Sequence, residues 1–266
     1  MELSAEIEKH AADVIHLVVS ERQVFTKIGG RPSGKSGCFA WPTWKDRSLA
    51  FVMQIKLSEI PMISQMGPYP NEGMLYVFYD QEQSTWGFDP NDRGSWRILF
   101  GPEDDDADEI PFPDDVDEDY RYPEVRLEPR VIKAYPNCDD AGVFGPEWSE
   151  EDYEQYSELA EGVFGSQPKH QIGGFPQAIQ SNAELMAIQC ESASNGIYCG
   201  DGSCYNSPEG RRIAARGTDW MLLLQIDSET EGANMWGDCG MLYFWIRKED
   251  LAKRSFENVW MILECC

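Results

Sequence analysis

The chain has 266 residues, and its 22 Lys and Arg against 47 Asp and Glu give a net charge of −25 and a pI near 4.3. Because a field of this sign repels phosphate, the composition excludes a general nucleic-acid-binding protein. No run of about 18 apolar residues occurs, so we expect no membrane-spanning helix. The hydrophobic content of 42%, with nine Trp and eleven Tyr, is typical of a folded globular protein.

The N-terminal stretch lacks the basic and apolar regions of a secretory signal. We therefore expect a cytoplasmic protein in which the eight cysteines are reduced thiols. Apolar residues also recur here with helical spacing, and Ser4 could serve as the N-cap. The sequence thus predicts an amphipathic helix over 4–21, with these residues on one face: Leu3, Ile7, Ala11, Val14 and Val18.

The stretch Gly29 to Ser36 matches the phosphate-binding pattern G-x-x-x-x-G-K-S. A phosphate-binding loop needs a helix that begins at the Lys-Ser pair. Here Gly37, Pro42 and several aromatic residues follow, which is poor helix sequence. We therefore favour a Gly-Gly-x-Pro turn and keep nucleotide binding as a third hypothesis.

Short apolar and aromatic runs bounded by Gly, Asp or Pro predict β-strands at 49–57, 74–79, 221–226 and 241–246. Four sequence blocks recur in the same order along the chain. Ile28–Pro32 returns as Ile172–Pro176, Phe51–Ile55 as Leu222–Ile226, Gly73–Tyr76 as Gly240–Tyr243, and Trp96–Leu99 as Trp260–Leu263. We interpret this as an internal duplication with copies near 24–100 and 168–264, the second with an insertion of about 27 residues.

The segment 103–119 between the copies contains eleven acidic residues in seventeen. Its few apolar residues cannot offset the entropy of ordering it, so we expect an exposed loop. After it, Ser149 and Asp152 form an acidic capping box. The stripe of Tyr153, Tyr156 and Ala160 before Gly162 then predicts a helix.

Two further segments concern helices. A short helix is predicted over 248–254, whereas residues 183–191 are ambiguous between strand and helix. The predicted fold is α+β and β-rich: a single domain over 1–266 made of a duplicated, mostly antiparallel β unit, a few helices, the N-terminal helix and the acidic connecting segment.

The sequence offers no coherent catalytic or metal-binding set. Cys190, Cys199 and Cys204 lack the tight Cys-x-x-Cys pairs of structural zinc sites, and the three histidines lie in no catalytic pattern. We expect no catalytic residue, no metal and no cofactor.

Residues shared by the copies serve the fold, so we interpret Gln54 and Gln225 as structural amides. Function is expected where the copies differ, in the insertion 189–220. Trp86-Gly87-Phe88-Asp89 and Trp236-Gly237-Asp238 form a further loose echo, each with an aromatic residue and a carboxylate near a strand end, and either line a cleft between the copies or pack as ordinary hairpins. The arginines of the insertion either form a contact surface or neutralise local acids. The candidate binding residues are Trp86, Asp89, Arg93, Asn195, Tyr198, Arg211, Arg212, Arg216, Trp236 and Asp238.

Several blocks resemble the YwqG-like family of bacterial proteins, a domain of unknown function, over about residues 24–264. The resemblance lies in the runs 170–176, 194–200, 222–228 and 236–244, and in Lys27–Gly30 and Trp41–Pro42. It implies a bacterial cytoplasmic protein of β-rich α+β architecture and brings no established activity, cofactor or catalytic residue. The genes of relatives sometimes lie near toxin genes, so the resemblance implies an immunity role. The Gly-Lys-Ser sequence after the first Gly-Gly-Pro departs from the family pattern.

The leading hypothesis is a non-enzymatic protein-interaction module of the immunity type, with an unidentified protein partner and neither nucleic acid nor membrane as a partner. Acidity would speed the encounter with a basic partner, and Trp and Tyr would supply the anchors. The alternative is an enzyme or binding protein with a small-molecule ligand in the cleft between the copies.

Overall fold

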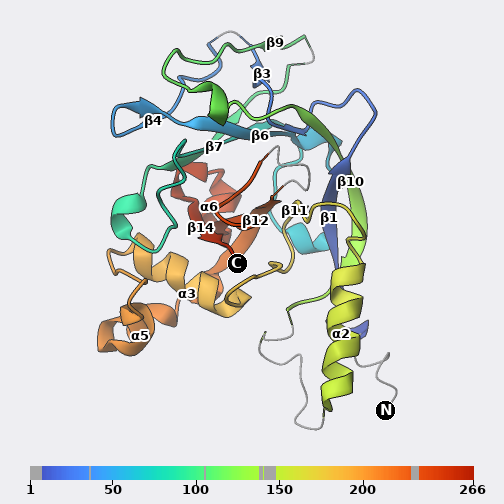
Figure 1. The fold of residues 1–266 in the computed structure, drawn as a ribbon, viewed down its shortest axis with the longest axis vertical. Helices are drawn as coiled ribbons and strands as arrows, with labels where there is room; N and C mark the ends of the chain where they lie inside the picture. The colour runs from blue at the N-terminus through green and yellow to red at the C-terminus, as the bar shows by residue number, and fades with distance from the viewer. Residues whose placement is uncertain (1–7, 36, 105, 138–139, 141–147, 229–233) are drawn as a thin grey trace.

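The computed structural model describes residues 8–35, 37–104, 106–137, 140, 148–228 and 234–266. A ten-stranded antiparallel sheet dominates it, in the order β14-β13-β12-β11-β1-β10-β2-β6-β7-β8 (Figure 1). Its strands are β1 (Ala12–Val19), β2 (Lys27–Ile28), β6 (Ala50–Lys56), β7 (Met74–Tyr79), β8 (Trp96–Gly101), β10 (Val125–Ala134), β11 (Gln171–Ile172), β12 (Trp220–Asp227), β13 (Met241–Arg247) and β14 (Trp260–Glu264).

Smaller elements cover this sheet. Two short pairs join β3 (Ser33–Gly34) to β9 (Asp108–Glu109) and β4 (Thr43–Trp44) to β5 (Arg47–Ser48). The helices are α2 (Glu150–Gly162), α3 (Ala183–Ser194), α4 (Ser203–Asn206), α5 (Pro208–Ala214) and α6 (Lys248–Lys253). The fold is therefore β-rich with several helices, as the sequence predicts. In the part of the chain that the structure describes, no helix has the length and apolar character needed to cross a membrane.

The strand order places two four-strand units on either side of the central pair β1 and β10. The first unit consists of β2, β6, β7 and β8, and the second of β11, β12, β13 and β14. The registers correspond, since Lys27 pairs with Gln54 and Gln171 pairs with Gln225. Each unit also has a register irregularity at the same place, between residues 51 and 53 in one and between 222 and 224 in the other.

The Gly-Gly turns also correspond. Gly29 and Gly30 have φ of 64° and 66°, and Gly173 and Gly174 have φ of 64° and 74°, so all four lie in the left-handed region that favours glycine. The first turn leads into β3, and in the described residues after it no helix begins at Lys35. This local structure does not provide the helix that a phosphate-binding loop requires.

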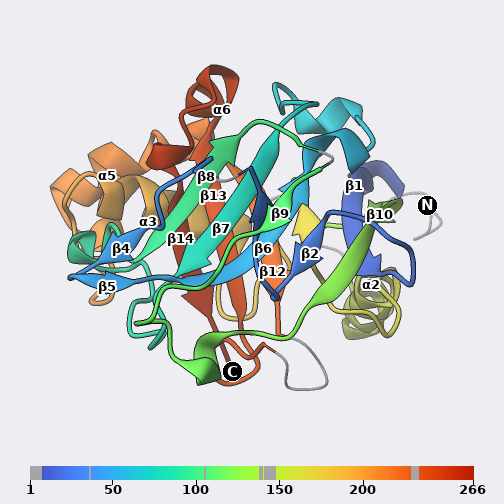
Figure 2. The ribbon, with the colours of Figure 1, turned by 90° about the horizontal axis from the view of Figure 1, so that it is seen from above.

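The two edge strands of the sheet lie close together, so the sheet is nearly closed (Figure 2). The rings of Trp96 in β8 and Trp260 in β14 are 5.0 Å apart. Trp96 Nε1–H donates to the carbonyl oxygen of Val259 at 2.9 Å, and Trp260 Nε1–H donates to that of Gly87 at 2.8 Å. Matching tryptophans thus reach across from each unit into the other, and one core cluster spans both.

The N-terminal helix predicted over 4–21 is wrong for the residues that the structure describes. Residues 12–19 form β1, which pairs with β10 on one side and β11 on the other, while residues 1–7 lie outside the description. The run is rich in β-branched residues, and its central five residues are buried. Burial on both faces removes the polar side that would distinguish a strand from an amphipathic helix.

Other predicted elements are found. Strands β6, β7, β12 and β13 fall within two residues of the expected ranges, and α6 matches the predicted short helix. Ser149 caps α2 through the predicted capping box with Asp152, and the ambiguous stretch 183–191 lies within α3. The acidic segment 103–119 contains β9, and Val116 within it is fully buried. The segment is therefore anchored to the first unit at these points.

Candidate functional site

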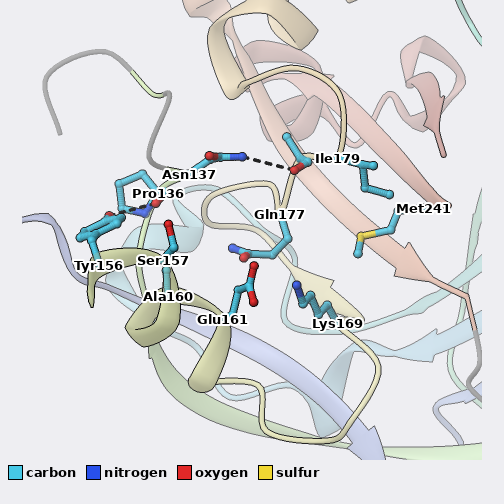
Figure 3. Close-up of a pocket in the computed structure, with 11 residues that line it drawn as sticks. Pro136, Asn137, Tyr156, Ser157, Ala160, Glu161, Lys169, Gln177, Ile179 and Met241 are labelled. Carbon is cyan, nitrogen blue, oxygen red and sulfur yellow. Dashed lines mark hydrogen bonds between the residues drawn. The ribbon is translucent and has the colours of Figure 1, made fainter. Parts of the chain in front are cut away.

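Side chains of the described residues fill the space between the two units. One open hollow of about 520 Å³ is lined by residues of both units, with Phe100 and Glu103 from one and Arg254 from the other. A separate cavity of about 270 Å³ lies between α2 and the segment 177–179 (Figure 3). Most of the residues predicted from sequence lie elsewhere, where a connecting segment of the first unit crosses the second.

That segment, residues 80–95, joins β7 to β8. Hydrogen bonds hold it against three parts of the second unit: Gln83 Nε2–H to the Met235 carbonyl (2.9 Å), Gly237 N–H to Gln83 Oε1 (3.0 Å), Leu263 N–H to the Trp86 carbonyl (3.1 Å), Cys199 N–H to the Phe88 carbonyl (2.9 Å) and Arg93 Nη2–H to the Ser194 carbonyl (3.4 Å). We call the surface formed by segments 83–93, 194–199 and 235–238 the seam surface. Three regions distant in sequence are thus brought together.

Local structure explains the shape of the crossing segment. Asp89 caps a short 3₁₀-helix, Pro90–Asp92, by accepting from the Asn91 N–H at 2.8 Å. Asp92 Oδ2 accepts from the Gly87 N–H at 2.9 Å, and burial raises the pKa of this carboxyl group against the lowering effect of its backbone hydrogen bonds. Gly87 has φ of 83°, and a Cβ there would collide with the Met261 carbonyl oxygen. Only glycine fits this close approach to β14.

Three large apolar side chains on the seam surface are exposed. The exposed fractions are 38% for Trp86, 48% for Tyr198 and 45% for Met235. Each belongs to a different segment, and the hydrogen bonds from Gln83 and Phe88 hold these segments side by side. The surface therefore presents aromatic and thioether groups on a fixed main chain.

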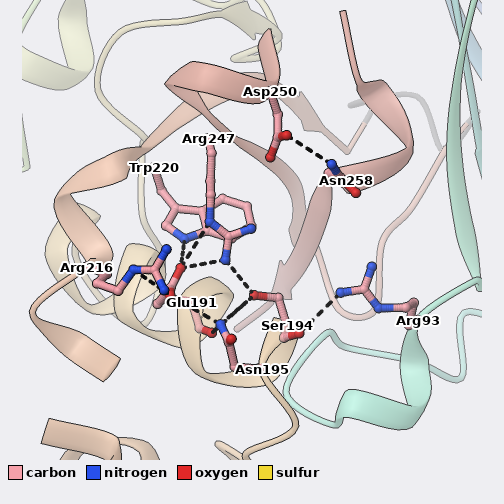
Figure 4. Close-up of polar contacts among 9 residues, drawn as sticks. All are labelled: Arg93, Glu191, Ser194, Asn195, Arg216, Trp220, Arg247, Asp250 and Asn258. Atoms are coloured by element: carbon pink, nitrogen blue, oxygen red, sulfur yellow. Dashed lines mark hydrogen bonds and ion pairs between the residues drawn. The ribbon is translucent and has the colours of Figure 1, made fainter. Parts of the chain in front are cut away.

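A buried carboxylate lies beneath the seam surface, at the end of α3 (Figure 4). Glu191 is 1% exposed and accepts from Arg247 Nη2 at 2.6 Å and from Trp220 Nε1 at 2.8 Å. Arg216 Nε lies 3.7 Å from its other oxygen, and Asn195 Nδ2 donates to that oxygen at 3.2 Å. The buried charge is therefore paired and hydrogen-bonded, as burial requires.

Of the predicted binding residues, Asn195 and Arg216 thus serve this network in the fold. Arg93 lies on the seam surface with its guanidinium 4.8 Å from the centre of the Trp260 ring. Burial lowers the pKa of Arg93, and the neighbouring positive charges of Arg247 and Arg97 lower it further. Among the described residues, Arg93 has no ion-paired carboxylate.

The other predicted residues separate into two groups. Arg211 and Arg212 are exposed on α5, where Arg211 donates to the Asn206 carbonyl at 2.6 Å and Arg212 lies 3.9 Å from Glu209. Asp238 is exposed at the edge of the seam surface. Trp236, however, is fully buried against Tyr79 and Tyr122, so its indole belongs to the core.

Cys190, Cys199 and Cys204 are free thiols buried in the core. Burial raises the pKa of Cys190 and of Cys199, which keeps both groups protonated and unreactive. Within the described ranges, no group of three His, Cys, Asp or Glu residues is arranged to hold a metal ion.

Glu191, Arg247 and Gln83 were not among the residues predicted from the sequence. The signal for Glu191 was its place in the last two turns of the helix Ala183–Ser194, where the neighbouring residues are mostly small or apolar and a carboxylate indicates a buried partner. Arg247 and Gln83 gave no comparable signal, because their roles depend on contacts distant in sequence.

The comparison with curated proteins gives no match. A family model described as a domain of unknown function, DUF1963, matches residues 26–265, which include both sheet units and the seam surface. The chain therefore belongs to the DUF1963 family.

Proposed function

We propose that this protein is a non-enzymatic protein-interaction module that binds a basic polypeptide through the seam surface. The observation that carries the proposal is the exposure of Trp86, Tyr198 and Met235 on three segments fastened to one another by hydrogen bonds. Trp, Tyr, Met and Arg are enriched at protein interfaces, and aromatic anchors supply most of the binding energy.

The charge of the chain favours a basic partner. The net charge of −25 attracts a positive surface at long range and speeds its encounter with the protein. The seam surface itself offers the carboxylates of Asp89 and Asp238 next to the cation of Arg93, which would fix the orientation of the partner. An immunity-type role and the YwqG-like assignment stay predictions within this proposal.

We infer that the two units are copies of an internal duplication, near 24–100 and 168–264, within a single domain. The four recurring sequence blocks, the corresponding registers and the matching Gly-Gly turns support this inference. The seam surface then lies where the two copies meet.

The experiment isolates the tagged protein at low salt from the cells that produce it and records its native mass. We expect the added mass of a polypeptide, and we expect Trp86→Ala with Tyr198→Ala to weaken its binding by about 30-fold or more, as for hot-spot residues. Val131→Ala is the matched control, because Val131 is 47% exposed on β10, outside the seam surface. Raising the salt concentration slows association with a basic partner.

Two results contradict the proposal. One is a native mass that equals the chain alone or a multiple of it. The other is a bound polypeptide that the seam variants and Val131→Ala retain equally.

A further inference from the structure

The cavity beside α2 has polar residues in its lining, and none of them belongs to the seam surface. Its wall consists of one face of α2, the two residues Pro136 and Asn137 that follow β10, the loop after β11 and the start of β13 (Figure 3). The residues that project charged or amide groups toward it are Glu161, Lys169 and Gln177. These three side chains converge from α2 and from two segments of the second unit.

The main chain that carries Lys169 and Gln177 is fixed by the buried amide of Gln225. Its Oε1 accepts from the Gln177 N–H at 2.8 Å, and its Nε2 donates to the Lys169 carbonyl at 2.8 Å. Tyr243 Oη–H donates to the Gln177 carbonyl at 2.8 Å, and Asp227 accepts from the Lys169 N–H at 2.7 Å. The two segments are therefore held in place before any ligand binds, which lowers the entropic cost of binding.

Asn137 Nδ2 in this lining donates to the Ala178 carbonyl at 3.2 Å. Three other polar groups, on Glu161, Lys169 and Gln177, have no partner within the described part of the chain. Glu161 and Lys169 form no ion pair with each other or with another described residue. Gln177 Nε2 is shielded from solvent and has no acceptor. A buried amide donor without an acceptor is uncommon and calls for an explanation such as a bound molecule.

The rest of the lining is mostly apolar. Pro136, Ala160, Ile179 and Met241 lie around the polar groups. Tyr156 also lines the cavity, and its hydroxyl is engaged by the Pro136 carbonyl at 2.9 Å. The volume of about 270 Å³ corresponds to about nine water molecules at ~30 Å³ each, which is the size of a small metabolite.

We propose that this cavity binds a free α-amino acid with an apolar side chain. The ligand carboxylate is held by Lys169 and by the free Nε2–H of Gln177, and the ligand ammonium is held by Glu161. Its side chain lies against Ile179 and Met241. The carboxylate and the ammonium of such a ligand are attached to one carbon atom. They match an acid and a base that face one cavity without pairing, because each forms a charge-assisted hydrogen bond.

This inference does not rest on the proposed protein partner, because the cavity and the seam surface share no residue. The test uses leucine as the probe, with thermal unfolding and titration calorimetry on the full chain. Isocaproate, which lacks the ammonium, and isopentylamine, which lacks the carboxylate, have the same apolar skeleton and serve as matched ligands.

We expect leucine at about one hundred times its Kd to raise Tm by about 5 to 10 °C, since a ligand of the native state stabilises it by mass action. Isocaproate and isopentylamine bind about ten-fold or more weakly than leucine, because each loses one charged contact. Glu161→Gln and Lys169→Met weaken leucine binding by the same factor. Glu158→Gln, an exposed change one turn away on α2, leaves binding unchanged.

Three results would overturn the proposal. The first is that leucine, methionine and valine produce neither heat nor a shift in Tm. The second is that isocaproate or isopentylamine binds as tightly as leucine. The third is that Glu161→Gln and Lys169→Met bind leucine as the unchanged protein does. Both variants change solvent-accessible side chains. Their Tm without ligand is expected to stay within a few degrees of the original value, so a loss of binding is not a loss of fold.

Discussion

The two sheet units share one strand plan but differ in what covers their outer faces. In the first unit, loops place Phe39, Trp41, Trp44 and Phe112 against the sheet residues Phe51, Tyr76 and Phe78. In the second unit, α3 packs against β12 and β14, and α5 packs on α3 (Figure 1). The inner faces of both units meet in one core, whereas the outer face is covered by loops in the first unit and by helices in the second.

This difference distinguishes the buried polar residues that both units share from those that only one unit has. Buried Gln54 and Gln225 make the same two main-chain contacts in each unit, so the amide belongs to the shared plan. Buried Glu191 has an arginine and an indole partner in the second unit, and it comes from the helical cover. The seam surface is built from the connections between β7 and β8 and between β12 and β13, together with the segment that ends and follows α3.

The largest expected effect on the free energy of unfolding comes from Glu191, which belongs to the helices that cover the second unit. Glu191→Ala leaves Arg247 half-buried without its carboxylate and Trp220 without its acceptor, so we expect a loss of about 3–5 kcal/mol in the free energy of unfolding. Urea denaturation measures it. Glu249→Ala is the control, because Glu249 forms an exposed pair with Lys253 on α6 and its loss costs under about 0.5 kcal/mol. If Glu191→Ala and Glu249→Ala lost equally small amounts of unfolding free energy, the Glu191 network would not be needed to hold α3 on the sheet.

A smaller effect on the free energy of unfolding is expected from the two buried glutamines that the units share. Gln54→Met leaves the Ser33 N–H and the Phe25 carbonyl without a partner, and Gln225→Met does the same to the Gln177 N–H and the Lys169 carbonyl. At about 1–2 kcal/mol for each of the two unsatisfied groups, we expect losses of about 2–4 kcal/mol that agree within about 1 kcal/mol between the two variants. Chemical denaturation of both variants, side by side, gives the comparison. A loss confined to one variant would show that the two amides are not equivalent.

The smallest expected effect lies in the central pair that separates the units. His16 on β1 is buried, its Nε2–H donates to the Pro168 carbonyl at 2.8 Å, and its ring packs edge-on against Phe164. Burial lowers the pKa of His16 below 6.5; electrostatic interactions with the His170 and Arg130 side chains lower it further, and the hydrogen bond to Pro168 opposes this in part.

The sign of the pH effect follows from that shift. Above pH 6.5 His16 is neutral in both states and its contribution is complete. As the pH falls below 6.5, the unfolded chain takes up the proton first, so stability decreases until the pH passes the folded-state pKa. The slope is at most about 1.4 kcal/mol per pH unit. We expect His16→Asn to remove this part of the pH dependence between pH 7 and 5. An unchanged profile of unfolding free energy against pH would contradict it.

Much of the fold could be predicted because its strongest signals are local. Buried strands such as 74–79 and 241–246 are short, apolar and bounded by turn residues, and the Gly-Gly turns need a left-handed backbone. The capping box at Ser149 depends on residues three positions apart. The prediction failed at 12–19, where burial on both faces of a central strand leaves no polar side to read.

The candidate site was predictable only in part. Asn195 and Tyr198 were chosen because they lie in the insertion that distinguishes the copies, and Trp86 because its segment echoes Trp236-Gly237-Asp238; the structure brings the segments of Trp86, Asn195 and Tyr198 together. Trp236 was chosen by the same reasoning and is fully buried, because an aromatic residue near a strand end suits the core as well as a surface.

By itself, the sequence determined the charge, the recurring blocks and most of the strands, since composition and local periodicity are properties of neighbouring residues. Only the tertiary structure decided which distant groups meet. It brought Glu191 to Arg247, the crossing segment 80–95 to β14, and Glu161 to Lys169 and Gln177 around one cavity. The physical reason is that these contacts join residues distant in the sequence and form only when the whole core is buried, and the free energy of that burial is not a property of neighbouring residues.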